Sequence, residues 1–389
     1  MKRRSFLIGA TTLTLSQLAS GCNGKQQMSL SVRLLQDSIP AQLLGQFRKA
    51  LKQPVTLNFE PEKQLQQLYQ DLKTWKQQAQ KKDTPKLLPL PFLGQQRRAI
   101  PNLVTLGDYW LETAIRQELI QPLAIEKLAG WQQLSPPWQA LVRRNQKGEP
   151  DNSGPVWGAP YRWGTTVIAY RRDKFKALGF APKDWSDLWR PELRDRISLL
   201  DQPREVIGLT LKKMGFSYNT EDLTKVPDLK KELLALHQQA KFYSSDRYLE
   251  PLILEDTWLA VGWSTDILAL QEQDRQIEAV VPDSGTSLWA DLWVQPASRV
   301  AEPNSESLAK QWIDFCWQQQ PAIDISLVSN AVSPILNTMA SANLPQEIQK
   351  NPLLLPDTSV IEKSEFLKPL STKAIEQYQA LWQEIRNVI

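Results

Sequence analysis

The chain has 389 residues, with 46 lysines and arginines against 42 aspartates and glutamates. This length is too great for one compact core, so we expect two lobes. The near balance of charge gives no case for nucleic acid or an anionic membrane surface as a partner. The one histidine, His237, lies in an amphipathic helical pattern, and there are only two cysteines. These counts argue against a His/Cys metal site and a Ser-His-Asp triad, so we expect no cofactor and no enzymatic activity.

The N-terminus has the layout of a secretory signal peptide. Three basic residues, Lys2, Arg3 and Arg4, precede an apolar stretch from Phe6 to Leu18. This stretch is too short to predict a membrane-spanning helix. The adjacent arginines also resemble a twin-arginine export signal, and an ordinary signal that happens to contain them is the alternative. Both interpretations predict export from the cytoplasm.

The end of this segment, Leu18-Ala19-Ser20-Gly21-Cys22, resembles a bacterial lipobox, although Ala19 stands where leucine is commonest. The resemblance implies that the thiol of Cys22 carries a lipid that anchors the protein to the membrane. The alternative is a buried or disulfide-bonded cysteine, with Cys316 as its only partner. We therefore expect a signal peptide at residues 1–21 and a lipid-anchored linker at residues 22–30.

After the linker, short apolar runs alternate with amphipathic helical patterns, which is typical of an α/β protein. In the first part of the chain we expect strands at residues 29–36, 54–61, 86–93 and 102–107, and helices from Pro40, over 62–82 and over 111–120.

Around Gly154 the pattern changes to a long apolar crossing, residues 156–172, with glycines where the backbone must bend. A turn with Trp185 and Trp189 follows. We then expect strands at residues 196–201, 257–263, 277–282 and 287–296, and helices at 204–215, 309–317 and 374–389.

Several of these segments resemble, in order and spacing, the bacterial spermidine/putrescine-binding proteins of ABC importers. The segments are APYRWGTTVIAY from Ala159, WSDLWRPELRDRISLLD from Trp185, AVGWSTD from Ala260, SLWADLWVQP from Ser287 and NAVSPILN from Asn330. The resemblance covers roughly residues 105 to 340, and the N-terminal part matches only in outline.

This resemblance implies an α/β, type II-like periplasmic binding protein fold, with two lobes that are joined by crossing strands and close on a ligand in the cleft between them. The expected lobes are residues 31–165 with 289–340 and residues 166–288 with 341–389. The expected crossings are near Thr165–Ile168, Thr286–Trp289 and Ala340–Asn343. The implied function is capture of a polyamine or similar amine-bearing cation in the periplasm, for delivery to the membrane permease of an ABC importer.

A polyamine site needs carboxylates for the ammonium groups and aromatic walls for the methylenes. Trp289 and Asp291 have the period-2 spacing that places both on one face of a strand. A carboxylate inside an apolar strand is rare without a partner, so we expect Asp291 to contact the ligand. The resemblance implies the same role for Glu205, which could instead charge the first turn of its helix.

The resemblance also places Trp263 as an aromatic wall, Tyr109 as an aromatic of the first lobe and Ser245 as a hydroxyl in the site. On the residues alone, both Trp263 and Trp289 could be core tryptophans. An acidic position of the family is Gln202 here, with Asp201 one residue earlier. Asp266 is an additional acidic residue that could replace the missing charge or cap a helix at the surface. These departures leave the preferred amine open.

Two further interpretations keep the fold but change the function. The ligand could be ferric ion or a small anion, with Arg162, Arg204 and Arg247 lining the cleft. No dense tyrosine cluster of the kind that binds iron is present near the crossings. The protein could also be an assembly lipoprotein without a ligand, or an enzyme on the same scaffold, although no motif pairs a nucleophile with a base.

Overall fold

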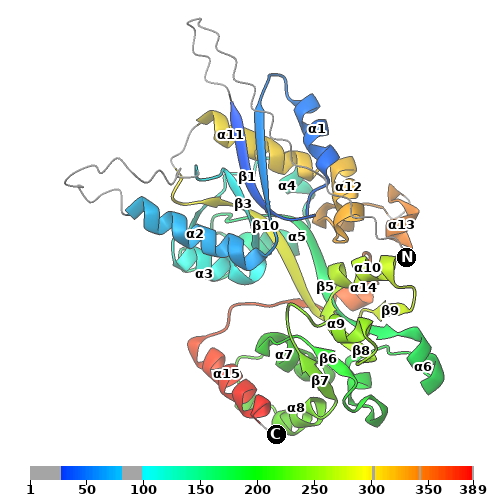
Figure 1. The fold of residues 1–389 in the computed structure, drawn as a ribbon. Coiled ribbons are helices and arrows are strands. Elements are labelled where there is room, and N and C mark those ends of the chain that lie inside the picture. The colour runs from blue at the N-terminus through cyan, green and yellow to red at the C-terminus, as the bar shows by residue number, and fades with distance from the viewer. Residues whose placement is uncertain (1–27, 81–98, 300–302, 341–342, 388–389) are drawn as a thin grey trace, which may run out of the picture.

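The structure is a computed structural model that describes residues 28–80, 99–299, 303–340 and 343–387 (Figure 1). The expected signal peptide, Cys22 and the strand expected at residues 86–93 lie outside these ranges. The other strands expected from apolar runs are all present, and the fold is mixed α/β.

Two long antiparallel strands connect two halves of the molecule. They are β5 (Ala159–Arg171) and β10 (Ser287–Pro296), drawn green and yellow in Figure 1. β5 has 13 residues and is buried throughout. At about 3.3 Å per residue it is roughly 43 Å long, which is long enough to belong to the sheets of both halves. The crossing expected near Thr165–Ile168 lies within β5. The crossing expected near Thr286–Trp289 coincides with the start of β10.

The upper half in Figure 1 contains a sheet in the order β2-β1-β3-β10-β5. The first three strands are parallel, and β10 joins β3 antiparallel. Helices cover both sides of this sheet (Figure 1). The elements here are β1 (Ser29–Leu35), α1 (Ala41–Ala50), β2 (Thr56–Glu62), α2 (Leu65–Gln80), β3 (Leu103–Gly107), the 3-10 helix η2 (Asp108–Trp110), α3 (Leu111–Arg116), β4 (Ile120–Gln121), α4 (Ala129–Gln133), α5 (Pro136–Val142), α11 (Pro303–Cys316), α12 (Gln319–Ser329), η6 (Pro334–Thr338) and α13 (Gln346–Gln349).

The lower half continues the same sheet in the order β5-β8-β6-β7, with β9 on the same strand β5. Strands β8, β6 and β7 are parallel to one another, whereas β8 and β9 are antiparallel to β5. The elements here are α6 (Arg172–Leu178), η3 (Trp185–Trp189), η4 (Pro191–Leu193), β6 (Ile197–Leu199), α7 (Pro203–Lys213), η5 (Leu223–Lys225), α8 (Leu229–His237), β7 (Ala240–Tyr243), α9 (Glu250–Ile253), β8 (Leu259–Trp263), α10 (Ser264–Gln273), β9 (Ile277–Val280), α14 (Thr358–Ile361), β11 (Glu365–Phe366) and α15 (Thr372–Arg386).

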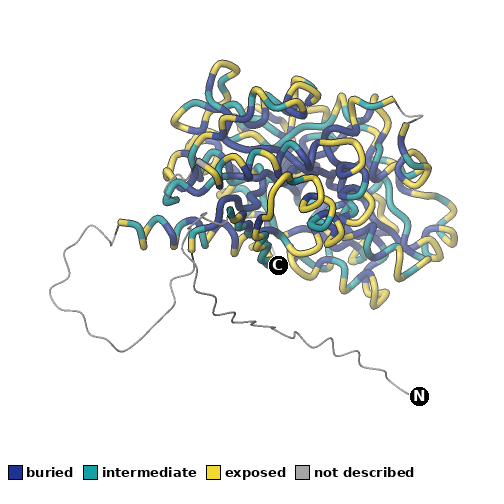
Figure 2. The backbone as a smooth tube through the Cα atoms, turned by 90° about the horizontal axis from the view of Figure 1, so that it is seen from above, coloured by how far each residue is buried: buried dark blue, intermediate teal, exposed yellow. Residues whose placement is uncertain are grey.

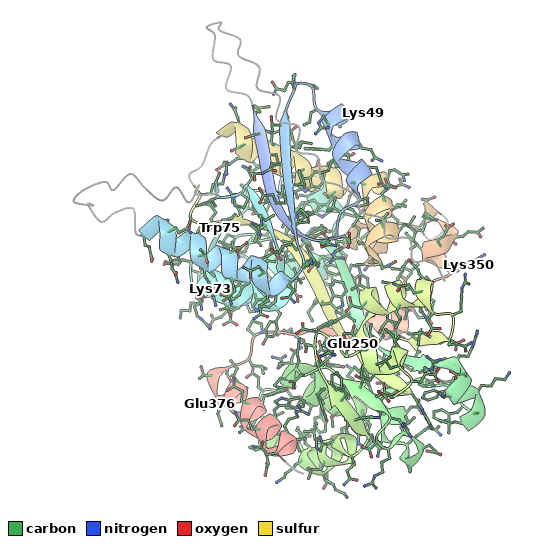
Figure 3. The ribbon with its side chains drawn as sticks, in the orientation of Figure 1. Lys49, Lys73, Trp75, Glu250, Lys350 and Glu376 are labelled. Carbon is green, nitrogen blue, oxygen red and sulfur yellow. The ribbon has the colours of Figure 1, made fainter. Side chains whose placement is uncertain are left out.

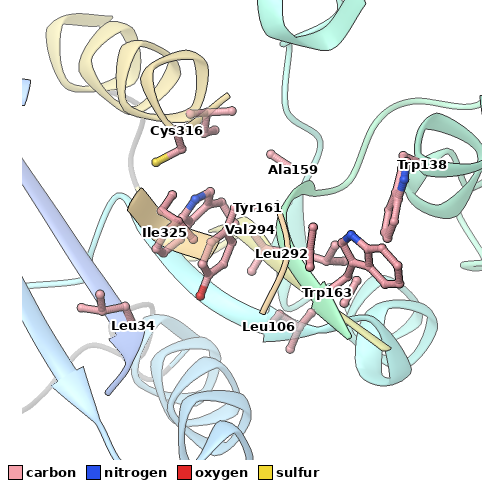
Figure 4. Packing of buried hydrophobic residues seen from close by; sticks show 14 of the residues in the cluster. Leu34, Leu106, Trp138, Ala159, Tyr161, Trp163, Leu292, Val294, Cys316 and Ile325 are labelled. Atoms are coloured by element: carbon pink, nitrogen blue, oxygen red, sulfur yellow. The ribbon is translucent and has the colours of Figure 1, made fainter. Parts of the chain in front are cut away.

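Buried residues form two hydrophobic clusters, and the tube in Figure 2 shows them inside a shell of exposed loops and helix faces. In the upper half, the ring of Tyr161 stacks on that of Trp293 with centroids 4.1 Å apart. Cys316 is fully buried beside this pair (Figure 4), as its apolar helical pattern predicts. These contacts hold the upper ends of β5 and β10 rigidly in the core.

A β-bulge interrupts the pairing of these two strands beside the junction of the halves. Leu292 pairs with Pro160 and Asp291 pairs with Arg162, so Tyr161 has no partner on β10. An extra residue of this kind re-aims the side chains that follow it. The bulge therefore sets the direction of Arg162.

The C-terminal part of the chain returns to the lower half. α13 still packs against α12 of the upper half. After it, β11 pairs with the start of β10, and α15 packs against α7 and α8 of the lower half. Glu376 on α15 and Lys49 on α1 mark distant ends of the molecule (Figure 3). The third expected crossing includes residues outside the described ranges, so it stays a prediction, as do the lobe boundaries.

Candidate functional site

Three polar side chains follow one another on one face of β10, where that strand passes between the halves. Ser287, Trp289 and Asp291 are alternate residues of the strand, so they share a face. Glu205 of α7 contacts Ser287 at one end of this row, and Arg162 of β5 contacts Asp291 at the other end. We call Ser287, Trp289 and Asp291 the β10 row.

Asp291 is almost completely buried, and its partner is Arg162 rather than solvent. The Nε and Nη2 atoms of Arg162 both lie 2.7 Å from Oδ2 of Asp291. Burial raises the pKa of Asp291, while the Arg162 guanidinium acts in the opposite direction. The sequence led us to expect that a ligand would supply the positive charge beside Asp291. In the structure, Arg162 of the same chain supplies it. Arg162 carries the same signal as Asp291, namely a charge inside an apolar strand.

Trp289 lies between the two ends of the row and packs directly on the backbone of β5. A Cβ atom added to Gly164 would meet Cζ2 of Trp289 at 2.4 Å and Oγ of Ser264 at 2.6 Å. A side chain at Gly164 would therefore push the indole out of place. The indole Nε1 is buried and has no hydrogen-bond partner among the described residues. The core tryptophans Trp163, Trp293 and Trp312 share this feature, so it does not distinguish a ligand site from the core.

Glu205 lies in the first turn of α7 and is almost completely buried. Its Oε2 accepts a hydrogen bond of 2.7 Å from the hydroxyl of Ser287. Burial raises its pKa, while the hydrogen bonds from Ser287 and Thr166 and the positive charge of Arg204 act in the opposite direction. In contrast to Asp291, Glu205 forms no ion pair with any described residue. A buried carboxylate without a cation is costly, and a cationic ligand would compensate it.

Asp108 is a carboxylate of the site that the sequence analysis missed. It follows β3, and its Oδ1 accepts a hydrogen bond of 2.9 Å from the backbone N–H of Ala290, which lies between Trp289 and Asp291 on β10. Burial raises its pKa to about 7, and the negative charge of Asp291 adds to this effect. The sequence feature that could have revealed Asp108 is a carboxylate at the end of an apolar strand.

Tyr109, the residue after Asp108, is 60% exposed and close enough to α7 to act electrostatically on Arg204.

Asp266 lies in the first turn of α10 and accepts a hydrogen bond of 2.8 Å from the hydroxyl of Tyr248. The side chain is exposed, yet surrounding protein raises its pKa, while Tyr248 and Arg162 act in the opposite direction. Trp263, at the end of β8, packs edge-on against the Tyr248 ring, with centroids 5.8 Å apart.

The remaining expected site residues, Ser245, Gln202 and Asp201, differ in how deeply they are buried. The hydroxyl of Ser245 is buried and has no hydrogen-bond partner among the described residues, and its role in a site stays a prediction. Gln202 is the N-cap residue of α7 and is half-buried. Asp201 is exposed and lies 3.9 Å from Arg386 of α15, so its carboxylate is directed away from the β10 row.

The three arginines considered for an anion site are already engaged. Arg162 holds Asp291, and Arg204 donates to the carbonyl oxygens of Lys368 and Tyr218. Arg247 forms a surface ion pair with Glu250. Within the described ranges, no group of three or more His, Cys, Asp or Glu residues is arranged to hold a metal ion. In the same ranges, no helix has both the length and the apolar character needed to cross a bilayer.

Comparison with known protein families gives one match over most of the chain. Residues 99–363 match the family described as bacterial extracellular solute-binding protein. The matched region includes β3, β5, β10 and every residue of the β10 row, together with Glu205 and Arg162.

Individual relatives are more distant. The chain is 25% identical over 285 residues to the spermidine/putrescine-binding periplasmic protein 1 of Haemophilus influenzae, covering 73% of this chain and 74% of that protein. It is 27% identical over 307 residues to the putrescine-binding periplasmic protein PotF of Escherichia coli, covering 74% and 78%. The crystal structure of the spermidine/putrescine ABC transporter substrate-binding protein PotD of Streptococcus pneumoniae is similar in fold, with a TM-score of 0.75 at 22% identity over 92% of this chain and 99% of that one.

Proposed function

Because this chain belongs to the family of bacterial extracellular solute-binding proteins, we propose that it captures an amine-bearing cation between its two halves. The observation that carries the proposal is Glu205, a buried carboxylate that has no ion-pair partner among the described residues and lies against the β10 row. An ammonium group beside it would compensate the buried charge. The indole of Trp289 would line the path of the methylenes and offer a face to the cation.

The residues of the proposed site come from both halves of the molecule. This arrangement suits a protein whose halves close around a ligand. β5 and β10 belong to both halves, while Glu205 and Asp266 come from the lower half and Asp108 and Tyr109 from the upper half. Bending of the two long strands would bring these groups together around a ligand and exclude water from it. The closed complex would then deliver the solute to the permease of an ABC importer.

The test is a calorimetric and thermal-shift screen of the purified protein with putrescine, cadaverine, spermidine and spermine. A ligand that binds only the native state raises the melting temperature. Sulfate, phosphate and ferric citrate serve as the comparison set for the other two ligand classes. Stabilisation by these compounds and by no amine at millimolar concentration would overturn the proposal.

Amine binding should strengthen as the pH rises from 6 to 8. The pKa of Asp108 is raised from 3.8 to about 7, so the folded protein holds a proton there that the unfolded chain releases, and this contribution to stability is lost as the pH passes 7. A bound ammonium favours the ionised form. Calorimetry at pH 6 in two buffers of different ionisation enthalpy should therefore detect proton release on binding. The Asp108→Asn variant should lose most of this pH dependence, and an affinity that falls with rising pH would contradict the assignment.

The proposed location is the periplasm, with the protein anchored to the membrane through a lipid on Cys22. Expressed in bacteria from the full-length gene, Cys22→Ser should release the protein into the soluble extracytoplasmic fraction, because a single serine hydroxyl cannot take the diacylglycerol. Fractionation followed by immunoblotting measures this. The Cys316→Ser variant is the matched control and should stay with the membrane. A Cys22→Ser protein that remains on the membrane would argue against the anchor.

A further inference from the structure

We propose that Arg162 is a resident cation that occupies the ammonium position beside Asp291, and that the site therefore accepts short amines and excludes longer polyamines. This inference rests on the proposed function, because it assumes an amine ligand. It makes Arg162 a specificity-determining residue that contacts the far end of the ligand path.

The contacts of the Arg162 guanidinium are those that a ligand ammonium would be expected to make. Two of its nitrogen atoms lie 2.7 Å from Oδ2 of Asp291. Its Cζ lies 5.9 Å from the centre of the Trp289 ring, within the range of a cation–π contact. A carboxylate on one side and an indole on another form an amine site, and here the cation belongs to the chain.

Arg162 is also held in place by its surroundings. Its Nη1 lies 3.4 Å from the carbonyl oxygen of Ser329, the last residue of α12, and cations are favoured at a helix C-terminus. The bulge at Tyr161 aims the side chain, of which only 5% is exposed. Displacing it would leave a buried guanidinium without a partner, which is strongly unfavourable. A ligand ammonium therefore cannot take its place.

The two ends of the β10 row consequently differ in charge. At one end Glu205 forms no ion pair with any described residue and is influenced only by the charge of the neighbouring Arg204, whereas at the opposite end the charge of Asp291 is balanced directly by Arg162. Asp108, the other carboxylate near Asp291, has a pKa of about 7 and is only partly ionised at neutral pH. A short diamine can place one ammonium against Glu205 and its second ammonium on the Trp289 indole in the middle of the row, before it reaches Arg162.

A longer polyamine meets a penalty at the Arg162 end. The Cα atoms of Ser287 and Asp291 are four residues apart on a strand, or about 13 Å. An extended molecule that spans this distance would place a second ammonium next to the guanidinium, and the two like charges repel strongly in a partly desolvated site. Rejection by a misplaced like charge is a common source of specificity.

The experiment is calorimetry of the full chain with putrescine, cadaverine, spermidine and spermine, in the native sequence and in three variants. Arg162→Met removes the resident cation, and Arg162→Lys keeps a charge there. Arg247→Met is the matched control, because it removes one arginine from an exposed pair with Glu250. We expect the native protein to bind putrescine at least tenfold more tightly than spermidine. Arg162→Met should reverse this ratio, while Arg162→Lys and Arg247→Met should preserve the preference for the shorter amine.

The native ranking is informative even if Arg162→Met folds poorly. Spermidine that binds the native protein as tightly as putrescine would overturn the inference, and so would an unchanged ratio in a folded Arg162→Met. In both cases amines still bind, so the proposed function stands. If no amine binds any of the four proteins, the proposed function fails and this inference fails with it. A larger rise in melting temperature with spermidine for Arg162→Met than for the native protein supports the inference.

Discussion

Replacing Asp291 with asparagine should lower the free energy of unfolding by about 3 kcal/mol, even in the absence of ligand. The substitution barely changes the shape of the side chain, but it leaves the Arg162 guanidinium buried without its counter-ion. Breaking a buried ion pair in this way typically costs 3–5 kcal/mol. Urea unfolding measures the loss as a lower midpoint, and an unchanged slope shows that the change is in stability.

Two variants make this result specific. Glu250→Gln removes the carboxylate of a surface pair with Arg247, and exposed pairs contribute only about 0–1 kcal/mol, so its midpoint should hardly move. The double variant Arg162→Met with Asp291→Leu removes both buried charges and should recover most of the stability lost by Asp291→Asn. If Asp291→Asn unfolds at the same urea concentration as the native protein, the pair does not have the structural role assigned to it.

Replacing Glu205 with glutamine should weaken amine binding by about 2 kcal/mol or more, which is roughly a 30-fold rise in Kd. The variant removes the charge that a ligand ammonium would meet while keeping the hydrogen bond that Glu205 accepts from Ser287. Titration calorimetry with the best amine from the screen measures the change. Glu250→Gln, an exposed glutamate of α9, is the matched control and should bind normally.

The unliganded stability of Glu205→Gln separates this role from a structural one. Glu205 forms no ion pair with any described residue, and burial raises its pKa more than Ser287, Thr166 and the charge of Arg204 lower it, so its charge opposes folding at neutral pH. Neutralising it should leave the melting temperature of the ligand-free protein unchanged or higher. This is the opposite of the effect expected for Asp291→Asn. Unchanged amine affinity, or a marked loss of stability in the absence of ligand, would contradict the assignment of Glu205 to the ligand.

Much of the fold follows from local patterns in the sequence. The apolar runs at residues 156–172 and 287–296 predict the two long strands, and they form β5 and β10. Alternation along a strand also places Trp289 and Asp291 on one face correctly, because strand side chains repeat every two residues. The helix expected at residues 204–215 is also present as α7, and Glu205 lies in its first turn.

The partners of these side chains were beyond the reach of local patterns. Arg162 and Asp291 are 129 residues apart in the chain, and Glu205 and Ser287 are 82 apart. Asp108 meets the backbone of Ala290 across 182 residues. Asp201 and Glu205 are both acidic and only four positions apart in the sequence, yet one faces Arg386 at the surface and the other is buried. Only the packing of α7 on the sheet distinguishes them.

The sequence by itself therefore determined the elements, the mixed α/β class and the alternation on β10, because each depends on spacing within one segment. Only the tertiary structure decided which carboxylate of the site is already neutralised. The bulge at Tyr161 aims Arg162 at Asp291, and strand pairing brings the two together from distant parts of the chain. Charge balance in a buried site depends on which groups meet in space, and this is why Glu205 and Asp291, for which the sequence predicted the same role, have different roles.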